Sequence, residues 1–165
     1  VSVRLPMPSR AIARRNTVSS HSQATDQPVT RLLFMEDETS IWEVVRPMLK
    51  QIDCEADFVA NGKDAIGRYR QSLISGNPYA LLMLDLTIRG GMGAKEVIRT
   101  LLALDPGVKA AVFSGYSTDP VFIEYQRYGF VGALKKPFTA DEFKTFVRQA
   151  LSRPAERNRL SNGLQ

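Results

Sequence analysis

Five short apolar runs alternate with segments of helical periodicity through the middle of the chain. The runs lie at residues 32–35, 55–59, 79–84, 110–113 and 132–134. Each run predicts a β-strand, and the run at 55–59 is the weakest of these signals. The run at 79–84 lacks polar alternation, which is typical of a strand that is covered on both faces in a parallel sheet.

The segments between the runs place apolar residues at the spacing of one helix face. Helices are therefore predicted around residues 41–49, 65–73, 97–104 and 143–151. A further helix is predicted to begin at Pro120, because Asp119 is a favoured N-cap and proline suits the first helical position. Thr139 and Glu142 have the spacing of a capping box. Pro47 lies inside the first helix, where a proline bends the axis or weakens a turn.

Strands that alternate with helices predict right-handed crossovers and a doubly wound α/β fold around a five-stranded parallel sheet. This pattern spans residues 30–151, which we expect to form one domain. Residues 9–29 are rich in Ser, Thr, Gln and Arg and lack apolar periodicity, which predicts a linker. Residues 152–165 are expected to form a C-terminal tail.

The composition is that of an ordinary globular protein. Of the 165 residues, 44% are hydrophobic and 24% are charged, which excludes a disordered or collagen-like chain. No apolar stretch is long enough to span a membrane, and no signal peptide is recognisable. The single cysteine, Cys54, excludes an internal disulfide and fits a reducing compartment, so we expect a cytoplasmic protein. The chain does not begin with methionine, and we expect it to be a fragment of a longer protein.

The net charge of +5 comes from the ends of the chain. Residues 1–30 carry four arginines and one aspartate, and residues 152–165 carry three arginines and one glutamate. Basic and acidic residues are equal in number between 31 and 151. Because a DNA-binding domain usually concentrates positive charge on a folded face, we expect solvated basic tails and no direct contact with nucleic acid.

Candidate functional residues directly follow four of the five apolar runs, where a doubly wound sheet gathers its ligands. They are Glu36, Asp37 and Glu38 after the first run, Asp85 after the third, Ser114 after the fourth, and Lys135 and Lys136 after the fifth. Each residue also has a purely structural explanation. Residues 36–38 match the acidic first turn of a helix, Asp85 a loop cap, Ser114 an ordinary turn, and the two lysines solvated charge. Their joint position after four strands favours one shared site over these separate explanations.

The acidic residues of this set indicate a metal-assisted phosphoryl site. Crowded carboxylates repel one another unless a cation joins them, and Mg²⁺ binds a few carboxylates while keeping waters for a phosphate. Asp85 follows the most buried strand and is the candidate nucleophile, since carboxylates form aspartyl-phosphate intermediates. Lys136 and Mg²⁺ would neutralise phosphoryl oxygens, and the Ser114 hydroxyl would donate a hydrogen bond to another.

Four segments around these residues resemble the receiver domain of two-component response regulators, across about residues 30–151. The segments are LFMEDE, LMLDLT, VFSG and LKKPF, in this order along the chain. The resemblance implies a flavodoxin-like fold with Asp85 as the phosphoacceptor. Asp37 would hold Mg²⁺ directly and Glu36 through a water molecule. The other implied roles are a backbone-carbonyl ligand at Thr87, a switch hydroxyl at Ser114 and a phosphoryl-pairing lysine at Lys136.

The same resemblance implies a signalling role. Asp85 would accept a phosphoryl group from a histidine kinase or a histidine phosphotransfer protein and so switch a partner interaction. A second copy of the chain is a further candidate partner. No enzymatic turnover is implied beyond self-phosphorylation and autodephosphorylation on Asp85. Residues 1–8 resemble the last strand of a histidine-kinase ATP-binding domain, which would make the parent protein a hybrid sensor kinase with this receiver at its C-terminal end.

Three positions depart from the pattern of the family. Ala133 stands where an aromatic switch side chain is often found, so a signalling change must use Ser114 and the loops, or another side chain such as Tyr116. Arg89 replaces a common proline and can reach a partner. Pro47 lies in the helix that usually docks the phosphodonor, and we expect it to alter partner choice.

Other function classes match parts of the sequence. A phosphohydrolase of the haloacid dehalogenase type matches Asp85-Leu-Thr87, but its nucleophile follows the first strand and its acidic pair comes later, the reverse of the order here. Another alternative is an interaction module that keeps the receiver fold but works without phosphorylation. A flavodoxin-type cofactor domain is disfavoured, because the acidic residues 36–38 would repel the phosphate of FMN.

Overall fold

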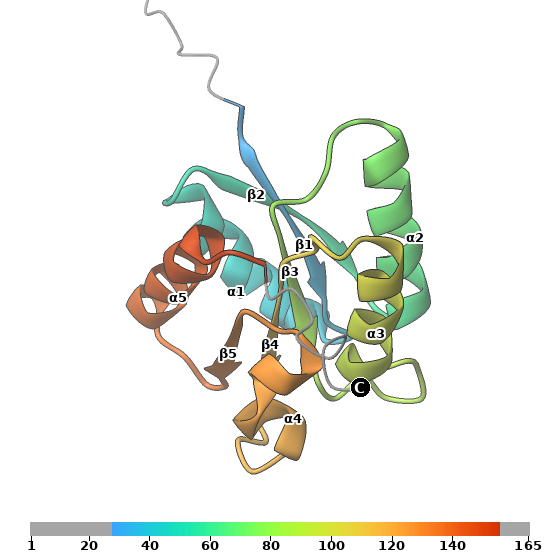
Figure 1. The fold of residues 1–165 in the computed structure, drawn as a ribbon. Helices are drawn as coiled ribbons and strands as arrows, with labels where there is room; N and C mark the ends of the chain where they lie inside the picture. The colour runs from blue at the N-terminus through green and yellow to red at the C-terminus, as the bar shows by residue number, and fades with distance from the viewer. Residues whose placement is uncertain (1–27, 156–165) are drawn as a thin grey trace, which may run out of the picture.

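The computed structural model describes residues 28–155, and its strands form one sheet (Figure 1). The strands are β1 (Thr30–Met35), β2 (Cys54–Val59), β3 (Leu81–Asp85), β4 (Ala110–Ser114) and β5 (Gly132–Lys135). Neighbouring strands are parallel, in the order β2-β1-β3-β4-β5, which confirms the predicted doubly wound sheet. The expected kinase remnant at 1–8, nearly all of the linker and most of the tail lie outside the described residues.

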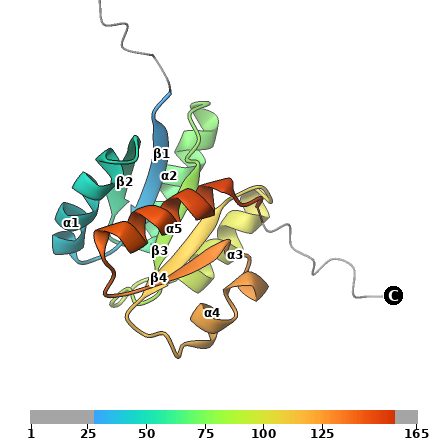
Figure 2. The ribbon, with the colours of Figure 1, turned by 90° about the vertical axis from the view of Figure 1, so that its left-hand side faces the viewer.

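Helices cover both faces of the sheet (Figure 1 and Figure 2). On one face lie α1 (Thr39–Lys50) and α5 (Ala140–Ser152), and on the other lie α2 (Gly62–Ile74) and α3 (Ala94–Leu104). The short helix α4 (Pro120–Ile123) and the 3₁₀ turn η1 (Tyr125–Tyr128) connect β4 to β5. None of the helices within residues 28–155 is long and apolar enough to cross a membrane.

The sheet separates two hydrophobic cores. Leu33 and Met35 of β1 pack with α2 and α3, whereas Leu32 and Phe34 pack with α1 and α5. Every residue of β3 is buried, as expected for a strand that is covered on both faces. Burial on both faces fixes the register of the central strands, because a shift by one residue would exchange the two faces.

Side chains at their N-termini cap three of the helices. Asn61 accepts a hydrogen bond from a backbone N–H in the first turn of α2, and Asp119 does the same in α4. Thr139 and Glu142 form the predicted capping box of α5. Helix α1 continues across Pro47 to its last residue, so the proline does not end the helix.

Three elements differ from the sequence-based prediction. Strand β3 begins at Leu81 rather than at residue 79. Tyr79 lies before the strand, and its hydroxyl donates a hydrogen bond to the carboxylate of Asp57. Strand β2 has the weakest sequence signal, but it begins one residue before the predicted run, at Cys54, and pairs with β1 along its whole length. The helix after Asp119 is a single turn, because η1 follows it and Gly129, with a φ of 90°, turns the chain toward β5.

Candidate functional site

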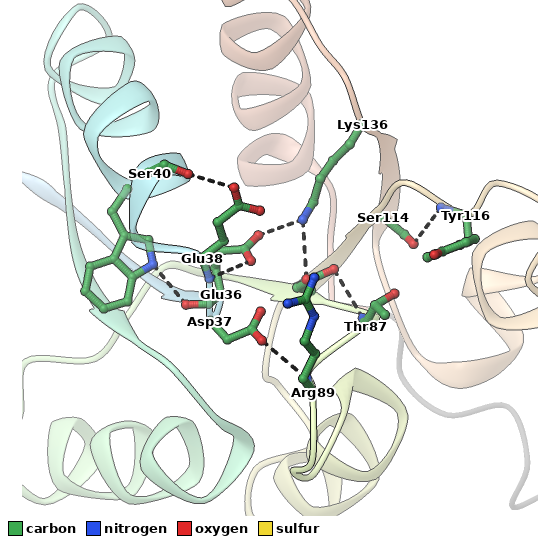
Figure 3. Close-up of polar contacts among 11 residues, drawn as sticks. Glu36, Asp37, Glu38, Ser40, Thr87, Arg89, Ser114, Tyr116 and Lys136 are labelled. Atoms are coloured by element: carbon green, nitrogen blue, oxygen red, sulfur yellow. Dashed lines mark hydrogen bonds and ion pairs between the residues drawn. The ribbon is translucent and has the colours of Figure 1, made fainter.

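The carboxyl ends of four strands bring the predicted site residues to one edge of the sheet (Figure 3). Glu36 and Asp37 follow β1, Asp85 and Ser114 end β3 and β4, and Lys136 follows β5. Carboxylate oxygens of Glu36, Asp37 and Asp85 lie within 4.8 Å of one another. The parallel topology thus brings together three acids from distant parts of the sequence, and we refer to them as the acidic pocket.

Lys136 is the cation of the acidic pocket. Its Nζ lies 2.6 Å from Oε2 of Glu36 and 3.3 Å from Oδ2 of Asp85. These two carboxylates are almost fully buried, and the Lys136 side chain is only 19% exposed. The ammonium also lies 4.6 Å from the centre of the Phe113 ring. One lysine therefore compensates two carboxylates that, within residues 28–155, have no other ion-pair partner.

Glu36 is buried and has an unusual electrostatic environment. Burial raises the pKa of Glu36 above its ordinary value, the hydrogen bond from Lys136 opposes this rise, and the charge of Asp85 adds to it. The backbone N–H of Glu38 donates to Oε1 of Glu36 at 3.1 Å. A cation in the acidic pocket would favour the ionised form of this carboxyl group.

The loop after β3 is tied to two of the acids. The backbone N–H of Arg89 donates to Oδ2 of Asp37 at 3.4 Å, and that of Thr87 donates to Oδ1 of Asp85 at 3.2 Å. Asp37 is partly exposed, and the Arg89 side chain extends toward the pocket in Figure 3. The β1–α1 and β3–α3 loops therefore meet at the mouth of the pocket.

Ser114 is fully buried at the end of β4. Its hydroxyl accepts a hydrogen bond from the backbone N–H of Tyr116 at 3.0 Å, and its carbonyl accepts one from the N–H of Lys136 at 2.8 Å. Within residues 28–155, the Ser114 hydroxyl makes no hydrogen bond to the acidic pocket. The side chain therefore lies next to the pocket but is bonded within its own loop (Figure 3).

Two candidate residues lie outside the cluster. The carboxylate of Glu38 accepts a hydrogen bond from the Ser40 hydroxyl at 2.8 Å, at the start of α1. Lys135 ends β5 and is exposed, whereas the adjacent Lys136 reaches the acids. Neighbouring residues of an extended chain point to opposite sides, so only one of two adjacent lysines can enter the pocket.

The sequence reasoning missed Trp42. This residue lies in the first turn of α1, and its Nε1 donates to the backbone carbonyl of Glu36 at 2.9 Å. The signal in the sequence is a single tryptophan close after the acidic residues. A half-buried indole usually finds an acceptor for its N–H, and the nearest loop is the one that follows β1.

The residues of the acidic pocket fit a hard divalent cation. All three side chains offer carboxylate oxygens, which Mg²⁺ prefers, and one of them, Asp37, is open to solvent. Within residues 28–155, Lys136 alone forms ion pairs with these acids, so the pocket keeps an excess of negative charge. An ion of charge +2 would remove that excess.

The model of the response regulator receiver domain family matches residues 32–148 of this chain. The chain belongs to this family. The resemblance in sequence is therefore confirmed at the level of the family, and the fold is that of a receiver.

Known proteins that resemble this receiver cover most of its length. The transcription factor SKN7 of Candida albicans is 26% identical over 144 residues, which are 85% of this chain but 24% of SKN7. The signal receiver domain of a LuxO repressor protein from Vibrio parahaemolyticus is 27% identical, with a TM-score of 0.59 over 74% of this chain and 89% of that chain. The receiver domain of the sensor histidine kinase PA1611 from Pseudomonas aeruginosa has a TM-score of 0.65 at 17% identity, over 75% of this chain and 98% of its own. The PA1611 structure holds a magnesium ion in its active-site cleft.

The three positions that depart from the usual receiver pattern lie in different elements, and of these only Arg89 bonds to an acid of the pocket. Ala133 is in β5 and packs against the core on the α2 and α3 side of the sheet. Tyr116, next to Ser114, is 65% exposed. Pro47 is exposed on α1. The structure thus places a small residue where an aromatic switch is common, and an exposed tyrosine near the buried serine.

Proposed function

We propose that this receiver accepts a phosphoryl group on Asp85 from a histidine phosphate and passes the change to a partner. An oxygen of Asp85 would attack the phosphorus and the phosphorus–nitrogen bond would break. The imidazole would leave with the electron pair of that bond and take up a proton. The observation that carries the proposal is the position of Asp85, which is buried, ends the central strand β3 and lies beside the ammonium of Lys136.

The other residues of the pocket divide the remaining tasks. Lys136 provides a fixed positive charge beside the oxygens of the transferred group. The ligands of a Mg²⁺ ion would be Asp37 and Asp85 directly and Glu36 through a water molecule. The backbone carbonyl of Thr87 would be a further ligand, as the resemblance to the family implies. When bound, such an ion neutralises charge on a phosphoryl group. Support comes from the set of oxygen donors and from the magnesium ion in the similar PA1611 receiver.

Ser114 would act as the switch. A phosphoryl group on Asp85 would offer the Ser114 hydroxyl a strong acceptor, in place of its present bond with the Tyr116 N–H. A move of the hydroxyl toward that group would draw the β4–α4 loop inward and change the surface around Tyr116. Because Ala133 carries no aromatic ring, the loop itself would transmit the change.

The partners follow from the chemistry of the transfer. A histidine kinase or a histidine phosphotransfer protein would donate the phosphoryl group, and a second copy of the chain is a further candidate partner. The parent protein would be a hybrid sensor kinase, with this receiver in the cytoplasm. Support comes from the strand-like pattern of residues 1–8 and from the likeness to the receiver of a sensor histidine kinase.

Labelling with a small acyl phosphate, with and without Mg²⁺, tests this function. The wild-type chain is expected to gain one hydroxylamine-sensitive phosphoryl group by intact mass spectrometry, only when Mg²⁺ is present. Asp85→Asn is expected to gain none. Asp141→Asn is the matched control, because that carboxylate is 92% exposed on α5, and it should be labelled like the wild type.

The other outcomes point to the other function classes. Undiminished labelling of Asp85→Asn would overturn the assignment of the phosphoacceptor. A wild-type chain that is never labelled would favour an interaction module that works without phosphorylation. Continuous release of phosphate from a small monoester would favour a phosphohydrolase.

A further inference from the structure

The only tryptophan of the chain, Trp42, contacts the loop that carries the proposed metal ligands. Its Nε1 donates to the backbone carbonyl of Glu36 at 2.9 Å. On the other side of the same residue, the N–H of Glu36 donates to the carbonyl of Val59 at 2.9 Å. The peptide groups before and after Glu36 are therefore both fixed, one by β2 and the other by the indole. The second of these peptides joins Glu36 to Asp37.

We propose that Trp42 is a positioning residue for the acidic pocket. By holding the peptide between Glu36 and Asp37, it fixes the direction in which Asp37 presents its carboxylate. The inference rests on the proposed function, in which Asp37 is a Mg²⁺ ligand. Asp37 depends on its backbone because its side chain is partly exposed and its hydrogen bond with the Arg89 N–H is long, at 3.4 Å. The other two acids are buried and share a lysine.

Aromatic packing holds the ring of Trp42 in place. The indole stacks on Phe58 of β2, with ring centres 5.4 Å apart and planes at 30°. Phe58 packs in turn against Phe34 of β1 at 5.5 Å, and the guanidinium of Arg46 lies 4.6 Å from its ring centre. This stack sets the tilt of the indole, so that its N–H faces the carbonyl of Glu36.

Packing alone does not explain the direction of the indole N–H. Trp42 is half-buried and lines an open groove together with Phe58, Lys63, Arg68 and Gln71. An N–H turned toward this groove would be satisfied by water. Instead it donates to the main-chain carbonyl that precedes a proposed metal ligand, where it restricts the backbone of that ligand.

The test compares Mg²⁺ binding by the full chain with binding by Trp42→Phe, which keeps an aromatic ring on Phe58 and removes the donor. Calorimetric titration with MgCl₂ alone, without a phosphoryl donor, measures the Kd. We expect Trp42→Phe to raise this Kd about threefold to tenfold. Hydrogen exchange should also be faster at the Asp37 amide in the metal-free variant. Val44→Ala on the same helix is the control, because Val44 is 52% exposed, and it should bind Mg²⁺ like the wild type.

Each outcome of the Mg²⁺ titration either supports or overturns the positioning role of Trp42. A wild-type Kd for Trp42→Phe overturns it, while Mg²⁺ binding by the wild-type chain would leave the proposed function in place. A wild-type chain that binds no Mg²⁺ overturns both the metal role and the inference. Where Trp42→Phe does not fold, Phe58→Leu replaces it, since this variant keeps the N–H and loosens the stack. A raised Kd then supports the role of Trp42, and an unchanged Kd overturns it.

Discussion

At the scale of single residues, the acidic pocket carries more negative charge than its lysine balances. Glu36 and Asp85 share the ammonium of Lys136, and Asp37 has no ion pair within residues 28–155. Repulsion among these carboxylates would oppose folding, and a bound cation would relieve it. Functional sites commonly carry such a cost, because the arrangement that binds a ligand is not the most stable one for the empty fold.

Asp37→Asn is expected to raise the free energy of unfolding in metal-free buffer, by about 0.5–1 kcal/mol. The substitution removes one of three neighbouring negative charges and keeps the shape of the side chain. Urea unfolding in the presence of EDTA measures the change. Asp141→Asn is the control, because its carboxylate is 92% exposed and pairs with Lys144 on the same helix, so its removal should not raise the stability. If Asp37→Asn lowers the stability instead, the repulsion argument is wrong.

At the scale of elements, a polar cluster joins β1, β2 and the segment before β3. Arg31 lies 2.8 Å from Oδ2 of Asp57, the Tyr79 hydroxyl donates to the same oxygen, and the Arg31 guanidinium carbon lies 4.5 Å from the centre of the Tyr79 ring. Burial raises the pKa of Asp57, but the hydrogen bonds from Tyr79 and Arg31 outweigh it, and the pKa lies below its ordinary value. Burial and the bond to Asp57 raise the pKa of Tyr79 to about 12.

Asp57→Asn is expected to lower the free energy of unfolding by about 1 kcal/mol near neutral pH, a small value because the carboxylate is 40% exposed. Because the folded-state pKa is depressed, the stabilisation is fully present above about pH 4 and is lost as the pH falls through the folded-state pKa. The difference between wild type and variant should therefore shrink toward about pH 3. Urea unfolding at several pH values measures it, and a difference that is constant with pH would show that the charge of Asp57 contributes nothing.

The elements differ in how far the sequence could predict them. The strands were predictable because apolar runs alternate with helical segments, and their order placed Asp85 and Lys136 at the same edge of the sheet. The Asp119-Pro120 signal marks where α4 begins but not where it ends, and the structure shows the 3₁₀ turn η1 soon after Ile123. A Cβ on Gly129 would lie 2.6 Å from Cδ1 of Leu102, so glycine allows this close approach to α3. Likewise, only the folded loop shows that Glu38 turns to Ser40 and that Trp42 bonds the Glu36 carbonyl.

At the scale of the whole molecule, the acidic pocket connects the parts that the sheet holds together. Its acids follow β1 and end β3, its lysine follows β5, and Phe113 of β4, beside Lys136, belongs to the core under α1 and α5. Unfolding of any of these strands would break up this arrangement of charges. A ligand of the pocket therefore binds the folded domain only, and its binding free energy adds to the stability of the whole fold.

Mg²⁺ is accordingly expected to stabilise the domain as one unit. Above the Kd, each tenfold increase in Mg²⁺ concentration should add about 1.4 kcal/mol to the free energy of unfolding. Far-UV circular dichroism and Trp42 fluorescence should report the same shifted transition, because a single domain unfolds cooperatively. NaCl at matched ionic strength is the control, since salt also screens the repulsion among Glu36, Asp37 and Asp85. An equal gain in NaCl would mean that screening, rather than a bound ion, stabilises the pocket.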